Sequence, residues 1–182
     1  MNRFKIIIIV QIMFLAITSH AQLNSITARF GGGWISGNLP SPITWNSGLD
    51  IDFNIHPVSK LDYRLSMFFA KDIKSLLPED RVTQYYPQII GLSANTYTNQ
   101  MLSDKTFLEG AVGVLILKDQ TYSDRNNLSY GAVASVAIRY KLSSLKNMSE
   151  FFSVGIVMDY GIAFTKFNLS YTSISSLIKY SF

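Results

Sequence analysis

From residue 22 to the end of the chain, apolar and polar residues alternate with a period of two. Between Trp45 and His56, five of the six residues on one face are apolar and none of the six on the other face is. The segment from Phe152 to Phe164 repeats this split, with large apolar residues on one side and mostly small residues on the other. A period of two is typical of β-strands whose two faces meet different surroundings. No stretch of a dozen residues in this region is continuously apolar or follows a helical period, so the pattern predicts an all-β chain.

Eight segments carry the alternation. We expect strands at residues 26–36, 45–56, 61–71, 86–96, 107–117, 129–141, 152–164 and 171–182. These lengths exceed the five or six residues usual in soluble proteins and suit a tilted strand that crosses a bilayer. The apolar face suits lipid, whereas the small and charged residues of the other face suit a barrel lumen better than a dry core. Because every backbone polar group must be paired in hydrocarbon, the strands must close on themselves. The sequence therefore predicts a transmembrane antiparallel up-and-down β-barrel of eight strands.

The connections and the aromatic residues fit the same arrangement. We expect outer loops at 37–44, 72–85, 118–128 and 165–170, and inner turns at 57–60, 97–106 and 142–151. Aromatic residues gather near the expected strand ends, where two interfacial girdles are typical of membrane barrels: Trp34, Trp45, Tyr63, Tyr140, Phe152, Tyr180 and Phe182.

The first 21 residues have the features of a cleaved secretory signal. Arg3 and Lys5 form a positive start, and residues 6–17 form an apolar run interrupted only by Gln11. Ser19-His20-Ala21 then offers a small-x-small cleavage site, with Gln22 as the first mature residue. The run is shorter than the 18 or so residues of a spanning helix, which disfavours the alternative of an uncleaved anchor. We expect residues 1–21 to be a signal peptide and 22–182 to be the barrel.

Composition and charge exclude several classes of protein. Only 15% of residues are charged, 13% are aromatic, and there is no cysteine. A disordered chain is excluded by the aromatic content, and a disulfide scaffold or thiol chemistry by the absence of cysteine. The net charge is +4, and it falls when the two cations of the leader are removed. Because the basic residues also form no cluster, no nucleic-acid partner is expected.

The carboxy terminus carries a resemblance to a known family. The chain ends in Tyr180-Ser181-Phe182, and Ile178 lies on the same face as Tyr180 and Phe182. This ending resembles the signal by which the insertion machinery recognises outer-membrane barrels. With the leader and the eight segments, the chain resembles the small eight-stranded barrels of OmpA/OmpX type, including porin-like, Bacteroidota-like members. The resemblance implies the outer membrane of a Gram-negative bacterium and contact with its lipid. That family has several activities, so function stays open.

Inward ionisable groups of so narrow a barrel need partners, because side chains fill its interior. Residues that face each other across a hairpin have numbers with a constant sum. Pairing Trp34 with Trp45 therefore places Arg29 opposite Asp50.

The second hairpin offers a similar pairing. Setting His56 opposite Asp62 places Asn54 opposite Arg64 and leaves Asp52 one step diagonal to that arginine.

Between the fifth and sixth strands, setting Leu117 opposite Gly131 places Glu109 opposite Arg139. We expect a lumen ion-pair network of six residues: Arg29, Asp50, Asp52, Arg64, Glu109 and Arg139. Its paired carboxylates could instead serve acid/base or metal chemistry, but two arginines beside two aspartates need no metal and nothing resembles a calcium loop. We expect no catalytic, metal or cofactor site.

His56 is the only histidine of the expected mature chain. Lipid-modifying barrel enzymes combine a histidine with a serine at the outer edge, because the hydroxyl needs a base within hydrogen-bond reach. His56 precedes Pro57 at the expected inner end, which favours a structural turn residue.

The second outer loop is the most unusual connection. Ile73, Leu76 and Leu77 have one-turn helical spacing before Pro78, so a short amphipathic piece could meet the membrane surface or another envelope protein, or could pack over the barrel mouth. We expect a non-enzymatic outer-membrane barrel with a structural or partner-binding role. A narrow porin-like conduit and, less favoured, a lipid-modifying enzyme are the alternatives.

Overall fold

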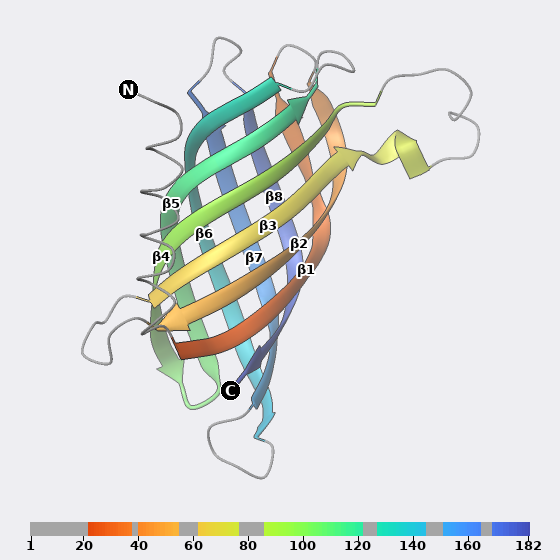
Figure 1. Cartoon of the computed structure of the whole chain (residues 1–182). Helices are drawn as coiled ribbons and strands as arrows, with labels where there is room; N and C mark the ends of the chain where they lie inside the picture. Colours follow the sequence, from red (N-terminus) through yellow and green to blue (C-terminus); the bar gives the residue numbers. More distant parts are fainter. Residues whose placement is uncertain are drawn as a thin grey trace, which may run out of the picture.

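The structure is a computed structural model that describes residues 22–37, 40–54, 62–76, 86–121, 127–144, 151–164 and 169–182. Eight antiparallel strands form one closed barrel in the order of the sequence (Figure 1). We call the end that carries the short 3-10 helix η1 the outer end, and the opposite end, where β8 finishes, the inner end. The expected signal peptide, His56 and Leu77 lie outside the described residues.

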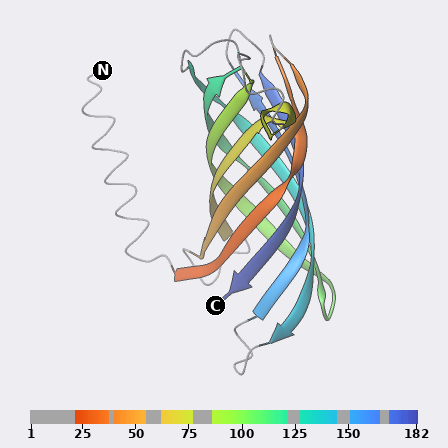
Figure 2. The ribbon, with the colours of Figure 1, turned by 90° about the vertical axis from the view of Figure 1, so that its right-hand side faces the viewer.

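Five strands are longer than their alternation alone predicts, and the other three have the predicted length. The eight strands are β1 (Gln22–Ser36), β2 (Ser41–Asn54), β3 (Asp62–Asp72), β4 (Gln88–Ser103), β5 (Thr106–Gln120), β6 (Asn127–Ser144), β7 (Phe151–Ala163) and β8 (Ser170–Ser181), with η1 at Ile73–Leu76 after β3. The five longer strands are β1, β2, β4, β5 and β6. Each strand pairs with its neighbours in sequence, and β8 pairs with β1 to close the barrel, as Figure 2 shows where the two lie side by side. The eight-stranded up-and-down barrel is confirmed.

One expected turn is wrong. The sequence places an inner turn at 97–106, but β4 continues to Ser103 and only Asp104 and Lys105 separate it from β5. Residues 98–103 no longer alternate in hydropathy, because this end of β4 is exposed on both faces. Its backbone still pairs with β5, so the strand continues although its residues no longer alternate between apolar and polar.

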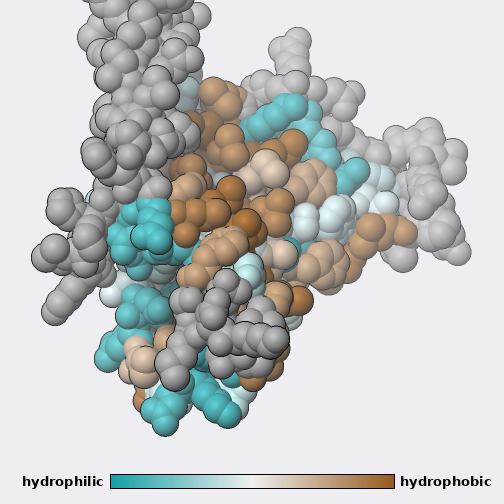
Figure 3. Space-filling view, turned by 60° about the horizontal axis from the view of Figure 1, so that its bottom comes forward, coloured by the Kyte–Doolittle hydropathy of each residue, from teal (hydrophilic) through white to brown (hydrophobic). Residues whose placement is uncertain are grey.

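The outer surface of the barrel is apolar in its middle. Large side chains from every strand face outward, among them Phe30, which is 64% exposed, and Val114, which is 66% exposed. Figure 3 shows hydrophobic side chains gathered across the strands, with hydrophilic residues toward the ends. Such a surface would be costly in water and is what a bilayer requires. The expected outward orientation of the apolar face is confirmed.

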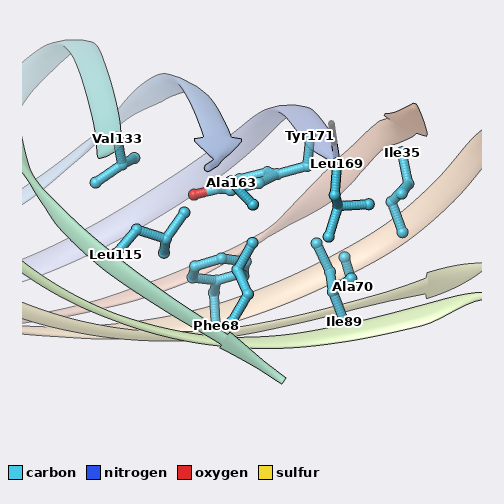
Figure 4. Close-up of a cluster of buried hydrophobic side chains, with 10 residues drawn as sticks. Ile35, Phe68, Ala70, Ile89, Leu115, Val133, Ala163, Leu169 and Tyr171 are labelled. Carbon is cyan, nitrogen blue, oxygen red and sulfur yellow. The ribbon is translucent and has the colours of Figure 1, made fainter. Parts of the chain in front are cut away.

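The interior differs from the expected lumen in its outer half. A lumen of small and charged residues was expected throughout, but ten buried residues fill the outer half as an apolar plug (Figure 4): Ile35, Phe68, Ala70, Ile89, Leu115, Leu117, Val133, Ala163, Leu169 and Tyr171. Dispersion contacts and exclusion of water stabilise such a cluster as they do a soluble core.

Two inward glycines make room for the aromatic rings of the plug. Phe68 and Tyr171 lie with ring centroids 4.7 Å apart. A Cβ added at Gly91 would lie 2.1 Å from the Phe68 ring, and one added at Gly161 would lie 2.0 Å from the Tyr171 ring. A ring on one strand therefore takes the space that a side chain on the neighbouring strand would fill.

This fit predicts that Gly91→Ala destabilises the barrel. The Phe68 ring cannot shift freely because it packs against Tyr171, so we expect the free energy of unfolding to fall by about 1–3 kcal/mol, as for other overpacked cores. Urea unfolding in detergent micelles measures it. Gly110→Ala is the matched control, since nothing lies within 4 Å of a Cβ there. Equal stability of the two variants would contradict the packing described.

Candidate functional site

The inner half of the barrel holds a cluster of five ionisable side chains, which we call the inner charge cluster: Asp52, Arg64, Glu109, Arg139 and Lys179. Each belongs to a different strand, and none exposes more than 6% of its side chain. Strand alternation turns all five inward, and the narrow lumen brings them together.

Asp52 and Glu109 are the two anions of this cluster. Asp52 lies 2.6 Å from the Arg64 Nε and 2.6 Å from the Lys179 Nζ, and it accepts a 2.7 Å hydrogen bond from Ser25. Glu109 lies 2.5 Å from Arg139, 3.0 Å from Arg64 and 3.0 Å from Lys179. Both carboxylates are thus shared between two or three cations.

Aromatic rings lie beside the cations of the inner charge cluster. The guanidinium carbon of Arg64 lies 4.5 Å from the centroid of the Tyr97 ring, and the Lys179 Nζ lies 5.3 Å from the same ring. Arg139 lies 5.3 Å from the Phe107 ring and donates a 3.0 Å hydrogen bond to Ser153. Cation–π contacts of this kind add to the ion pairs where water is excluded.

A second group, the middle charge cluster, lies between the inner cluster and the apolar plug. Arg29 lies 2.9 Å from Asp50 and 2.8 Å from Asp159, which also accepts a 3.0 Å hydrogen bond from Ser173. The two clusters together contain four cations and four anions. Buried charge is tolerated when it is paired and hydrogen-bonded, and the balance leaves none of these eight unpaired.

All six residues that the sequence places in the lumen lie there, divided between the two clusters, but the expected registers are wrong. Asp50 faces Thr27 instead of Arg29, and Arg64 faces Asp52 instead of Asn54. Three further expected pairs are also wrong: Trp45 faces Gly32 instead of Trp34, Gly131 faces Leu115 instead of Leu117, and Arg139 faces Phe107 instead of Glu109.

Each of these slips amounts to two residues. An even slip keeps every side chain on its face of the sheet. Long arginine side chains also reach diagonal neighbours two residues away. For these reasons Arg29 still contacts Asp50 and Arg139 still contacts Glu109 although neither pair is directly opposed.

Sequence reasoning missed two members, Asp159 and Lys179. Alternation places both on inward faces, so the signal was present. Pairing across consecutive hairpins does not reach them, because Arg29 of β1 meets Asp159 of β7 and Lys179 of β8 meets Asp52 of β2. Only closure of the barrel brings those strands together.

A small cavity lies in the interior beside the middle charge cluster. Its volume is about 10 Å³, and it lies beside Arg29, Asn46, Asp159 and Tyr171, which is room for about one water molecule. In the described part of the chain, no three acidic or histidine side chains are arranged to hold a metal ion. Nor do the described residues contain a helix long and apolar enough to cross a membrane.

The remaining candidate residues lie on the outside. Ile73 and Leu76 of η1 are exposed, so neither packs into the barrel mouth. The Trp45 indole donates a 3.3 Å hydrogen bond to Ser75, which holds η1 against the outer wall.

The carboxy-terminal residues form an aromatic cluster at the inner end. Ile178 points outward, and the Tyr180 ring lies 4.9 Å from Phe182 and 4.9 Å from Phe152, measured between centroids. Three of the aromatic residues expected at the inner end, Phe152, Tyr180 and Phe182, therefore lie together there.

Comparison with known proteins identifies the architecture. No protein-family model matches the chain, and no curated protein sequence matches it. Among solved structures, Neisserial surface protein A superposes with a TM-score of 0.60 at 11% identity, over 89% of this chain and 99% of that one. Ail, the attachment invasion locus protein of Yersinia pestis, in complex with the heparin analogue sucrose octasulfate, superposes with a TM-score of 0.54 at 9% identity, over 88% and 98%. The chain therefore has the fold of the small eight-stranded outer-membrane β-barrels.

Proposed function

We propose that the protein is a non-enzymatic integral barrel of the outer membrane of a Gram-negative bacterium, with a structural or partner-binding role. The observation that carries this proposal is the filled interior. The apolar plug and eight balanced charges occupy the lumen from the outer to the inner half. A solute could pass only by separating buried ion pairs and displacing the plug. The role that we assign to the protein is therefore contact with lipid and with other envelope components, through the outer surface and the ends of the barrel.

Three features support the membrane location. The apolar outer surface fits a bilayer, and closure leaves no unpaired strand edge in its middle. Residues 1–21 would direct export and then be removed. The outward aromatic ending at Ile178, Tyr180 and Phe182 would be the segment that the insertion machinery recognises.

The partner-binding role is assigned to η1. Its exposed Ile73 and Leu76 would contact another envelope protein, together with Leu77, and the Trp45 hydrogen bond to Ser75 would limit the entropy lost on binding. Photo-crosslinking in native outer membranes tests this role. A crosslinker at Leu76 should yield a reproducible protein adduct that one at Asp104, in the inner turn, does not. Identical adduct patterns would contradict it.

A porin-like conduit and a lipid-modifying enzyme predict different results. We expect no steady single-channel conductance from the purified barrel in planar bilayers, because the apolar plug and the paired charges of the described residues occupy the interior. Steady conductance would favour the conduit and overturn the proposal. An enzyme would depend on its one mature histidine, so a lipid-turnover activity that His56→Ala abolishes would equally overturn it.

A further inference from the structure

The outer ends of β3, β4 and β5 carry a group of polar side chains that neither charge cluster uses. Lys71, Gln88, Lys118 and Gln120 all occupy outward positions, because their neighbours Asp72, Ile89 and Asp119 are buried in the interior. Lys71 pairs with Gln88 and Gln88 with Gln120, so three of the four lie in one row across the sheet. The Gln88 amide donates a hydrogen bond to Gln120.

The sheet separates opposite charges at this place. Asp72 and Asp119 turn into the barrel. There Asp72 accepts a hydrogen bond from the backbone N–H of Lys74, and Asp119 accepts hydrogen bonds from the backbone N–H and the hydroxyl of Thr121. Lys71 and Lys118 turn outward on the other face. Within the described residues, no carboxylate forms an ion pair with either lysine. Two cations that lack an ion-pair partner among the described residues are thus presented on the lipid-facing side, with the outer end of β4 between them.

The separation of these lysines suits a large phosphorylated ligand. Lys118 faces Ile90, two residues from the Gln88 position that Lys71 faces. Ladder spacings place the two Cα atoms about 12 Å apart, within joint reach of two lysine side chains. An ammonium group binds phosphate as a point charge, and the Gln88 amide adds a hydrogen-bond donor between the two.

An apolar groove lies directly below the lysines. A groove of about 460 Å³ runs between the outward side chains of β2, β3 and β4, lined by Leu49, Met67, Phe69 and Ile90. Phe69 and Ile90 stand in the same row as Lys118. A second groove of about 480 Å³ shares Leu49 and Met67 with the first and continues to Leu92 and Val114. Through the shared residues the two grooves adjoin on the apolar outer wall.

We propose that this surface binds one phosphorylated, multiply acylated lipid of the outer leaflet. Lys71, Lys118 and Gln88 hold its phosphates, and its acyl chains occupy the two grooves below. Charge complementarity selects the headgroup, because the cations stand where the apolar belt ends and lipid phosphates lie. The inference rests on the proposed function, since it requires the outer end to face the outer leaflet, and it assigns the lipid contact to one side of the barrel.

Native mass spectrometry of the purified barrel in neutral detergent micelles tests the site. The probes are diphosphorylated lipid A, its dephosphorylated form and inorganic phosphate. We expect discrete adducts with the phosphorylated lipid, much weaker ones with the dephosphorylated lipid, and no displacement by inorganic phosphate at equal concentration. The double variant Lys71→Gln/Lys118→Gln should weaken binding roughly 10- to 30-fold, given the contribution of each cation near anionic lipid. Met67→Trp, which fills the groove, should also weaken it.

The matched control is Lys105→Gln, which removes an exposed cation at the inner turn. It should bind as the parent does. Equal binding of phosphorylated and dephosphorylated lipid, or equal loss in Lys105→Gln and the double variant, would overturn the site. Displacement by inorganic phosphate would reduce it to a simple anion site and overturn the lipid assignment. Failure of the barrel to insert into vesicles would instead overturn the proposed function, so the two failures are distinguishable.

Discussion

Asp52→Asn should lower the free energy of unfolding by about 3–5 kcal/mol, the range for removing one partner of a buried ion pair. Asp52 is completely buried and contacts Arg64, Lys179 and Ser25. The substitution keeps the shape of the side chain but leaves three cations of the inner charge cluster with Glu109 alone. Urea titration of the refolded barrel in micelles, followed by tryptophan fluorescence and by heat-modifiable migration on gels, measures the change.

A second variant, Lys179→Met, tests whether the charges of the inner cluster act together. Lys179→Met alone leaves two cations and two anions in the inner charge cluster, so adding it to Asp52→Asn removes one of the unpaired cations. The double variant should therefore lose less than the sum of the single variants, which is the mark of coupled sites. Asp104→Asn, at the exposed inner turn, should change stability by no more than about 0.5 kcal/mol. Strict additivity would show that the cluster does not act as a unit.

Val114→Arg should lower the free energy of unfolding by about 2–4 kcal/mol, the cost of arginine near the bilayer midplane on the lipid face of a barrel. Val114 lies in the middle of β5 and points outward. The barrel is refolded into lipid vesicles for this measurement, because the effect depends on depth in the bilayer.

Leu128→Arg is the control for depth. Leu128 is also outward and 59% exposed, but it lies at the outer end of β6. The same substitution there should cost only about 0–1 kcal/mol, because the guanidinium reaches the interface. Equal effects at the two positions, or no effect at Val114, would show that the apolar belt is not immersed in lipid.

Alternation in the sequence predicted the faces of the strands better than their ends. In β7, every outward and inward assignment from Phe152 to Ala163 agrees with the structure, since a strand that divides lipid from lumen has no freedom in which face is apolar. The sequence predicted the inner end of β4 too early, at residue 96 instead of Ser103. Side chains that lie outside both lipid and lumen need not alternate between apolar and polar. Backbone pairing, which leaves no trace in hydropathy, determines where that strand stops.

The apolar plug shows a different limit. Phe68 and Leu115 occupy inward positions, and a local pattern reads such residues as irregularities in a polar face. Whether an inward apolar side chain is a fault or part of a core depends on its partners at the same height on distant strands. Phe68 of β3 packs on Tyr171 of β8, which the sequence separates by about a hundred residues. The need for glycine beside each of these rings can be recognised only once that contact is known.

The sequence by itself determined the number of strands, which face of each meets lipid, and six of the charged residues that enter the lumen. These properties follow from a two-residue period, which the backbone imposes on each strand independently of the others. The tertiary structure decided the registers, the division of the lumen into an apolar plug and two charge clusters, and the inclusion of Asp159 and Lys179. Those depend on how far each strand is displaced along its neighbour when the sheet closes, and closure is a property of all eight strands together.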